Sequence, residues 1–187
     1  DRPRERARCT NLGRVPQPLG ERRIASSLQS GLSLTLASAT GSATVASATC
    51  IETLLLDPRR EMEALSGLAG QADAVLVDAP CSGTGTWRRN PEARWRLDEA
   101  ELARLAELQA YLLDIAAQLI KPGGRVVYVT CSLLDEEGAG QFEAFLARHP
   151  QLQPKAMALP LGQARGQGIR LAPAHDGTDG FFIACAG

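Results

Sequence analysis

Two cysteines in this sequence each follow a short apolar run and stand in a polar turn. Cys81 comes soon after the run Ala74–Val77, and Cys131 comes soon after Arg125–Val129. Buried parallel strands end in loops that meet at one edge of their sheet. A cysteine in such a loop is well placed to act as a reactive side chain. The sequence therefore predicts an active site that contains two thiols.

Two aspartates occupy the same kind of position as these cysteines. Asp57 directly follows the run Ile51–Leu56, and Asp78 directly follows the run that precedes the first of the two thiols. Both carboxylates are therefore expected at the edge of the sheet that carries the thiols. The two histidines lack a comparable setting, because His149 precedes a proline at an expected helix end and His175 lies in an expected loop.

The cysteine pattern argues against a metal site and against a disulfide framework. The five cysteines are odd in number and show no CxxC spacing; they are Cys9, Cys50, Cys81, Cys131 and Cys185. Free thiols in a reducing compartment fit this pattern better than either alternative. A lone cysteine is usually a small buried apolar residue, which is the interpretation we give to Cys9, Cys50 and Cys185.

Strands alternate with helices from Ile51 onward, as expected for an α/β fold. Asp98 with Glu101 three residues later is the spacing of a capping box at a helix start. Five apolar residues then recur at helical spacing and predict a buried helix face; they are Leu105, Leu108, Leu112, Ile115 and Leu119. Lys121–Gly124 ends this helix. A second helix is expected over residues 135–148, and a late strand over Phe181–Ala184.

Residues 1–49 differ in composition from the rest of the chain. Residues 1–23 are rich in Arg, Pro and Gly, and residues 25–49 consist almost wholly of Ser, Ala, Thr, Gly and Leu. Leu32, Leu34 and Leu36 alternate with polar residues as in a strand, but the tract that follows has little apolar volume to bury. We predict that residues 1–49 are an atypical segment of mostly irregular or weak structure.

Length and charge limit the class of protein. The chain has 187 residues and a formal net charge of −1, which fits one domain without a generally basic surface. Contact with nucleic acid would therefore need a local patch, for which the candidate is Arg88, Arg89, Arg94 and Arg96. No run approaches the roughly 18 apolar residues of a membrane span, and the first residues of the sequence lack the continuous apolar core that a secretory signal is expected to have. These features predict a cytoplasmic protein without a membrane partner.

Five motifs in register give the chain a family resemblance that covers residues 51–187. In chain order they are Asp78–Ala–Pro–Cys81–Ser–Gly–Thr–Gly85; Arg88–Arg–Asn–Pro–Glu92 with Trp95; Lys121–Pro–Gly–Gly124; Thr130–Cys131–Ser132 with Glu136 and Glu137; and Arg170–Leu–Ala–Pro173 with Thr178–Asp–Gly–Phe–Phe182. Their order and spacing resemble the RNA 5-methylcytosine methyltransferases of the RsmB/Nop2/Sun family. Five motifs together are far more specific than any one alone.

The resemblance implies a fold and a reaction. The fold would be the Rossmann-like α/β fold of class I S-adenosylmethionine-dependent methyltransferases, with residues 50–187 as the carboxyl part of the catalytic domain. The reaction would be methyl transfer from S-adenosylmethionine to carbon 5 of cytosine in RNA, with ribosomal RNA as the expected substrate. Carbon 5 is a weak nucleophile, so such an enzyme first adds a thiolate to carbon 6.

The resemblance also implies roles for individual residues. Cys131 would be the nucleophile, and Cys81 would help to release the product. Asp57 would contact the adenosine of the cofactor, and Asp78 would lie beside the methyl donor and hydrogen-bond the target base. Arg88 and Arg89 would contact RNA phosphates, and the target base would have to leave its stack to reach the thiol; a solvated loop is the alternative for these two arginines.

The amino-terminal segment departs from the family pattern. The family's Ala-Pro-Gly-Gly-Lys-like cofactor loop does not occur upstream of Asp57, and no Asp or Glu lies between Glu21 and Glu52. The first strands of the fold are therefore expected to be missing, which would leave Ile51–Leu56 without a neighbour and one sheet edge exposed. The change of composition near Cys50 suggests the hypothesis that residues 1–49 are a frame-shifted or mis-started translation.

Two other functions remain open at this point. A catalytically incomplete fragment would bind RNA or a protein partner without consuming the cofactor. A cysteine hydrolase would use Cys131 with His149 or His175 and would react with an activated ester. The absence of a convincing histidine motif disfavours the hydrolase.

Overall fold

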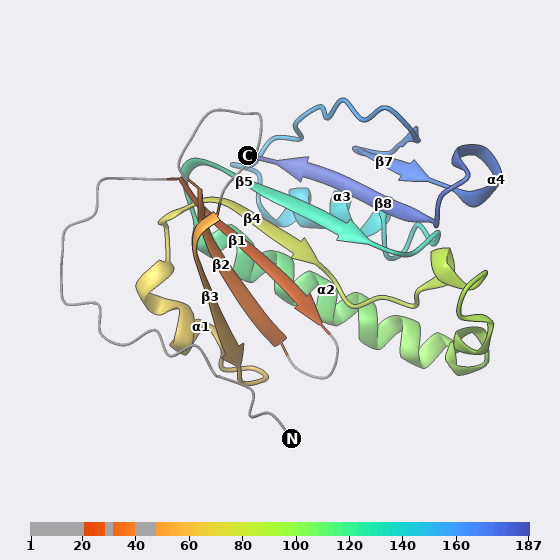
Figure 1. Cartoon of the computed structure of the whole chain (residues 1–187), viewed down its shortest axis with the longest axis horizontal. Helices are drawn as coiled ribbons and strands as arrows, with labels where there is room; N and C mark the ends of the chain where they lie inside the picture. Colours follow the sequence, from red (N-terminus) through yellow and green to blue (C-terminus); the bar gives the residue numbers. More distant parts are fainter. Residues whose placement is uncertain (1–20, 29–31, 40–47) are drawn as a thin grey trace, which may run out of the picture.

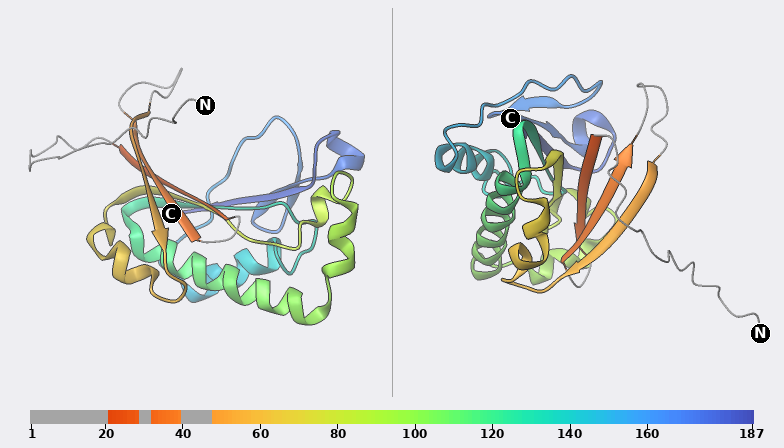
Figure 2. Two further views of the ribbon diagram at one scale, coloured as in Figure 1. Left: turned by 60° about the horizontal axis from the view of Figure 1, so that its bottom comes forward. Right: turned by 90° about the vertical axis from the view of Figure 1, so that its left-hand side faces the viewer.

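The computed structural model describes residues 21–28, 32–39 and 48–187, which form an eight-stranded sheet with helices against it (Figure 1). The strand order is β3-β2-β1-β4-β5-β8-β7-β6. The strands are β1 (Glu21–Leu28), β2 (Leu32–Ala39), β3 (Ala48–Leu56), β4 (Ala72–Asp78), β5 (Ile120–Thr130), β6 (Gln163–Arg165), β7 (Gly168–Leu171) and β8 (Phe181–Ala186). The helices α1 (Glu61–Leu65), α2 (Glu99–Leu119) and α3 (Ala139–Arg148) lie on one face of the sheet, as Figure 2 shows.

The centre of the sheet is formed by β4, β5 and β8. β4 and β5 run parallel, with Asp78 beside Val129, whereas β8 runs antiparallel to β5. The two parallel strands therefore end at the same edge of the sheet, and β8 begins there. Short helical turns lie in the loops before and between these strands; they are η1 (Ser66–Leu68), η2 (Thr84–Thr86), η3 (Pro91–Arg96) and α4 (Pro173–Asp176).

Helix α2 begins where the sequence predicts it. The Asp98 side chain accepts a hydrogen bond from the backbone N–H of Glu101 at 2.8 Å, as an N-cap does. The Glu101 carboxylate pairs with Arg104 instead of reaching back to the cap, so half of the capping box is formed. The predicted apolar face of this helix lies in the core, where Leu112 and Leu119 are buried.

Helix α3 begins later than the sequence suggests. Residues 135–138 form a turn in which the carbonyl oxygen of Asp135 accepts hydrogen bonds from the N–H groups of Gly138 and Gly140. The helix then begins at Ala139 and ends before His149. Its aromatic side chains Phe142 and Phe145 are fully buried against the sheet and α2. The turn at 135–138 matters for the site, because it carries Glu137 inward.

Strands β1 and β2 differ from the expectation of a mainly irregular amino-terminal segment. β1 pairs in parallel with β4, and β2 lies between β1 and β3, antiparallel to both. The positions expected to be vacant beside Ile51–Leu56 and beside β4 are thus occupied, and the exposed edge expected there is not formed. The physical reason is that β3 and β4 each offer unpaired backbone groups, which a hairpin of small residues with alternating leucines can satisfy. The domain boundary near residue 49 and the frame-shift hypothesis stay predictions.

The pairing of the first strands also decides where Asp57 lies. β3 is antiparallel to β2, which is antiparallel to β1, so β3 runs in the same direction as β1, β4 and β5. Its carboxyl end, with Asp57, therefore lies at the edge where β4 and β5 end. In the part of the chain that the structure describes, no helix is both long and apolar enough to span a membrane.

Candidate active site

The structure brings the two predicted thiols together. Cys81 lies in the loop after β4, here called the first thiol loop (residues 79–86), and Cys131 begins the loop after β5, the second thiol loop (residues 131–138). Because β4 and β5 are parallel neighbours, these loops leave the sheet side by side. The Sγ atoms of Cys81 and Cys131 are 3.3 Å apart, and both side chains are half-buried. This distance fits a hydrogen bond between a thiol and a thiolate.

The environment makes the two thiols unequal. A hydrogen bond from Cys81 is the largest cause that lowers the pKa of Cys131, to about 7. The same contact, together with burial, raises the pKa of Cys81. Since only the thiolate is a good nucleophile, this difference in pKa favours Cys131 as the sulfur that reacts near neutral pH, with Cys81 as the hydrogen-bond donor in that state.

This inequality predicts different alkylation profiles. The Cys131 thiolate fraction rises with pH through its pKa, so its reaction with iodoacetamide should be half-maximal near pH 7. Cys185 is an internal comparison, because burial raises its pKa and it should need a higher pH. Peptide-resolved mass spectrometry after timed labelling measures both in one sample. Equal pH midpoints for Cys131 and Cys185 would contradict the prediction.

A third loop meets the two thiol loops through the backbone. The N–H of Gly85 donates to the carbonyl oxygen of Cys131 at 3.0 Å, and the N–H of Gly180 donates to the carbonyl oxygen of Gly85 at 2.8 Å. Gly180 directly precedes β8, so the three strands β4, β5 and β8 are tied together at the edge that carries the thiols. A Cβ atom on Gly85 would stand 2.6 Å from the carbonyl carbon of Gly180, which leaves room only for glycine.

Gly85→Ala should therefore destabilise the protein. Overpacking against rigid backbone costs about 1–3 kcal/mol, and we expect the upper part of that range because all three nearest atoms are main-chain atoms of Gly180. Urea unfolding followed by circular dichroism measures the change. Gly67→Ala is the matched control, since a Cβ there meets nothing within 4 Å. Equal stability of the two variants would refute the close contact.

The two predicted carboxylates lie at the thiol edge but apart from each other. Asp78 ends β4 and is close enough to Cys131 for its charge to act on that thiol. Partial burial raises the pKa of Asp78 above its ordinary value. Asp57 is exposed after β3, and the strand order places three inter-strand spacings, about 14 Å, between β3 and β4. Asp78 can thus act at the thiols, whereas Asp57 can act only at the far end of an extended ligand.

The predicted basic residues lie on an exposed segment next to the same loops. Arg88 and Arg89 both pair with Asp179, which directly precedes Gly180. Arg94 stacks on Trp95, with its guanidinium 4.5 Å from the ring centroid, and the Trp95 side chain is 77% exposed. These contacts fix one end of the basic segment beside the thiol loops and leave its charged groups in solvent.

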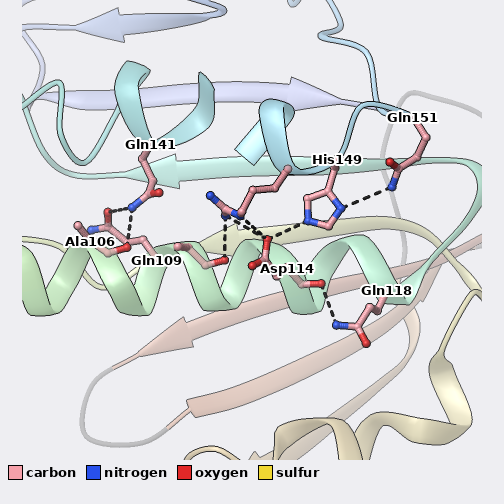
Figure 3. A network of polar contacts seen from close by, with 9 residues as sticks. Ala106, Gln109, Asp114, Gln118, Gln141, His149 and Gln151 are labelled. Atoms are coloured by element: carbon pink, nitrogen blue, oxygen red, sulfur yellow. Dashed lines mark hydrogen bonds and ion pairs between the residues drawn. The ribbon is translucent and has the colours of Figure 1, made fainter. Parts of the chain in front are cut away.

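The histidines do not join the site. The imidazole of His149 contacts Asp114 at 2.8 Å in the interface between α2 and α3, with Gln151 on its other nitrogen (Figure 3). Arg148 pairs with the same Asp114 carboxylate. His175 is exposed and lines a cavity of about 340 Å³ with Arg165 and Arg170. Neither histidine is a hydrogen-bond partner of Cys131. The structure therefore places no histidine where it could act as the general base of a cysteine hydrolase, the alternative function considered from the sequence.

The sequence assigned no role to several residues beside the thiols, although Ser82, Ser132 and Glu137 lie within the quoted motifs. Glu137 and Gln109 are fully buried, and both contact the first thiol loop. Ser82 and Ser132, each next to one of the thiols, connect the two loops through their hydroxyl groups at 3.3 Å. For the two serines, the only indication in the sequence was their position directly after Cys81 and Cys131 within the motifs. Periodicity alone could not show that a glutamate after the second thiol turns inward.

Comparison with known proteins agrees with the fold. A model of the family described as 16S rRNA methyltransferase RsmB/F matches residues 39–186. A ribosomal RNA small subunit methyltransferase B from Thermus thermophilus is 49% identical over 115 residues, which are 61% of this chain and 29% of that protein. The crystal structure of PH0851 is similar with 40% identity and a TM-score of 0.60, over 63% of this chain and 27% of that one.

A further solved structure extends the comparison. NSun6 from Pyrococcus horikoshii, determined with SFG, is 25% identical with a TM-score of 0.52, over 60% of this chain and 29% of that chain. The chain thus spans less than a third of the length of each of these relatives.

Proposed function

Because this chain belongs to the RsmB/F family of 16S rRNA methyltransferases, we propose that it transfers a methyl group from S-adenosylmethionine to carbon 5 of a cytosine in ribosomal RNA. The observation that carries the choice of carbon 5 is the 3.3 Å contact between Cys81 and Cys131. Methylation of a ring nitrogen or of a ribose hydroxyl needs no covalent help from sulfur. Methylation of carbon 5 does, because that carbon becomes nucleophilic only after addition to carbon 6.

Cys131 is the proposed nucleophile. Its Sγ forms a bond to carbon 6 of cytosine, and the electron pair of the 5,6 double bond moves to carbon 5. The hydrogen bond from Cys81 keeps a large fraction of Cys131 as thiolate near neutral pH, since it lowers the pKa to about 7. Cys131 lies directly after the carboxyl end of β5, where its sulfur is half-buried. A cytosine that has left its stack can reach it there.

Asp78 is proposed to hold the proton that the base needs. Addition of sulfur to carbon 6 makes ring nitrogen 3 more basic, and a carboxyl group beside it can share or donate a proton. The pKa of Asp78 is raised by partial burial, which keeps its protonated form available at higher pH than for an ordinary aspartate. Its charge is felt at Cys131, which supports a position beside the same base.

Cys81 is proposed to assist release of the product. After methylation, water takes the proton of carbon 5, the electron pair of that C–H bond re-forms the 5,6 double bond, and Cys131 leaves carbon 6 as a thiolate. A donor S–H 3.3 Å from that sulfur stabilises the departing charge. The same hydrogen bond therefore prepares the nucleophile before the reaction and stabilises the leaving group after it.

The cofactor would bind along the edge on which the strands end. S-adenosylmethionine supplies an electrophilic methyl group when bound. Asp57 and Asp78 fit its two ends, because both lie at this edge and three strand spacings separate β3 from β4. Between them, β1 and β2 contribute no acidic residue after Glu21, so a carboxylate for the ribose is not offered by these strands.

Ribosomal RNA would contact the exposed basic segment. Arg88 and Arg89 outnumber their shared partner Asp179, so positive charge remains for a phosphate. Arg94 and Trp95 lie farther along the same segment and are exposed. Asp179 directly precedes Gly180, whose N–H donates to Gly85 of the first thiol loop. RNA bound by Arg88 and Arg89 would therefore lie beside the thiols.

The test is incubation of the chain with methyl-labelled S-adenosylmethionine and unmodified 16S ribosomal RNA. Nucleoside mass spectrometry is expected to find label only in 5-methylcytidine. Label in another nucleoside would overturn the assignment of carbon 5. Retention of RNA on the chain without any methylation would overturn catalysis by this chain and support the RNA-binding fragment instead.

A further inference from the structure

Glu137 is a buried acid that the proposed reaction does not use. Its side chain is fully buried, although a buried carboxylate is costly unless donors surround it. Three donors do so: the backbone N–H of Ser82 at 2.8 Å, the side-chain amide of Gln109 at 3.1 Å and the hydroxyl of Ser82. Among the described residues, no basic side chain forms an ion pair with it. Hydrogen bonds to the first thiol loop and to α2 therefore replace a counter-ion.

These contacts hold the backbone on both sides of Cys81. Gln109 donates from the same side-chain amide to the carbonyl oxygen of Pro80 at 2.8 Å, and Glu137 accepts from the N–H of Ser82. Pro80 and Ser82 are the two neighbours of Cys81. The position of Glu137 is itself fixed, because the Tyr128 hydroxyl donates to its backbone carbonyl oxygen at 2.7 Å. Glu137 and Gln109 thus hold the Cys81 sulfur in place through the backbone of its two neighbours.

Glu137 also sets the direction of a chain of hydroxyl groups between the thiol loops. The Ser82 hydroxyl donates its only hydrogen to the Glu137 carboxylate. In the 3.3 Å contact between the Ser82 and Ser132 hydroxyl groups, the donor must therefore be Ser132. By the same reasoning, Thr84 donates to Ser132 in their 3.1 Å contact. Thr84 in turn accepts from the N–H of Leu133 at 2.8 Å. The hydroxyl groups of Thr84, Ser132 and Ser82 therefore all donate in one direction along the chain, toward the Glu137 carboxylate.

We propose that Glu137 is a positioning residue that holds the Cys81 thiol against the Cys131 sulfur, through the backbone of Ser82 and through the oriented hydroxyl groups between the loops. Its importance in turnover rests on the proposed function. Its effect on the two sulfurs does not, because that effect can be measured without RNA or cofactor.

The charge and the positioning of Glu137 have opposite effects on Cys131. The negative charge by itself raises the pKa of Cys131, so loss of charge alone would lower it. The hydrogen bond from Cys81 is the larger influence and lowers that pKa, so loss of positioning would raise it. The direction of the shift in a Glu137 variant therefore distinguishes the two roles.

The experiment compares Glu137→Ala with the wild-type chain by iodoacetamide labelling of Cys131 across pH. We expect the midpoint to rise from about 7 by about one unit, which makes labelling at pH 7 about fivefold slower. Glu137→Gln should restore most of the wild-type midpoint, because its amide can still accept from the N–H of Ser82 and contact the hydroxyl. Glu136→Ala is the matched control, since Glu136 is adjacent and exposed, and should leave the midpoint unchanged.

Three results would overturn the proposal. They are a midpoint that falls in Glu137→Ala, a midpoint that does not move, and Glu137→Gln behaving like Glu137→Ala. If Glu137→Ala does not fold, Ser82→Ala decides the question, because it removes the hydroxyl link and leaves the carboxylate in place. A smaller upward shift in Ser82→Ala supports positioning, and an unchanged midpoint refutes it.

Discussion

Replacing Cys131 by alanine is expected to abolish methylation of RNA, with a loss of at least roughly 10⁴-fold, as found when an enzyme loses its nucleophile. Without this sulfur, no bond to carbon 6 forms and carbon 5 stays too weak a nucleophile. The same variant should form no covalent complex with RNA that carries 5-fluorocytosine. That complex forms only after sulfur attacks carbon 6. It then persists, because fluorine at carbon 5 cannot be removed as the proton normally is, so the bond to sulfur is not broken. Denaturing gel electrophoresis of labelled RNA measures the complex.

The matched control for this variant is Cys185→Ala. Cys185 is buried near the end of β8, beside Val127 of β5, whereas the two thiol loops lie at the edge of the sheet where β8 begins. It should retain methyl transfer and trapping. Covalent trapping that persists in Cys131→Ala would assign the nucleophile to another residue, and Cys81 would be the first to examine.

Replacing Cys81 by alanine is expected to have a different effect, namely accumulation of a covalent adduct with ordinary RNA. Cys131 would then have no donor 3.3 Å from its sulfur to stabilise it as it leaves carbon 6. Methylated product should be released about 100-fold more slowly, which corresponds to loss of one hydrogen bond to a charged group, about 1.5–3 kcal/mol. A slow-migrating RNA–protein band in a denaturing gel is the readout.

The double variant Cys81→Ala/Cys131→Ala provides the control, because it should show no such band. Rapid turnover by Cys81→Ala, without an accumulated adduct, would contradict the role in release. A pH midpoint of Cys131 labelling that stays near 7 in Cys81→Ala would contradict the hydrogen bond itself, since that bond is the main cause of the lowered pKa.

The core elements of the fold could be predicted from residue patterns. The helical repeat from Leu105 to Leu119 and the cap at Asp98 place α2, and the apolar runs before Asp78 and Cys131 place β4 and β5. These signals are local, because burial of one helix face or one strand requires a periodicity that the sequence displays directly. The prediction of two thiols after these strands rested on the same local context.

The amino-terminal strands could not be predicted in this way. β1 contains mainly small and polar residues, and the alternating leucines of β2 give only a short signal. β1 also pairs with β4, which is distant in sequence, so a local pattern does not show that pairing. Strand pairing is decided by backbone groups that need partners and not by side-chain pattern alone.

The sequence by itself determined which side chains this protein brings to its loops: Cys81, Cys131, Asp57 and Asp78 each follow a strand, and parallel strands end together. Only the tertiary structure decided that the two sulfurs lie 3.3 Å apart, that Asp57 lies three strands away from β4, and that Glu137 turns inward to hold the first thiol loop. The reason is that hydrogen bonds such as Ser82 to Glu137 join residues 55 positions apart. No local pattern records such a contact, because it exists only after the sheet has formed.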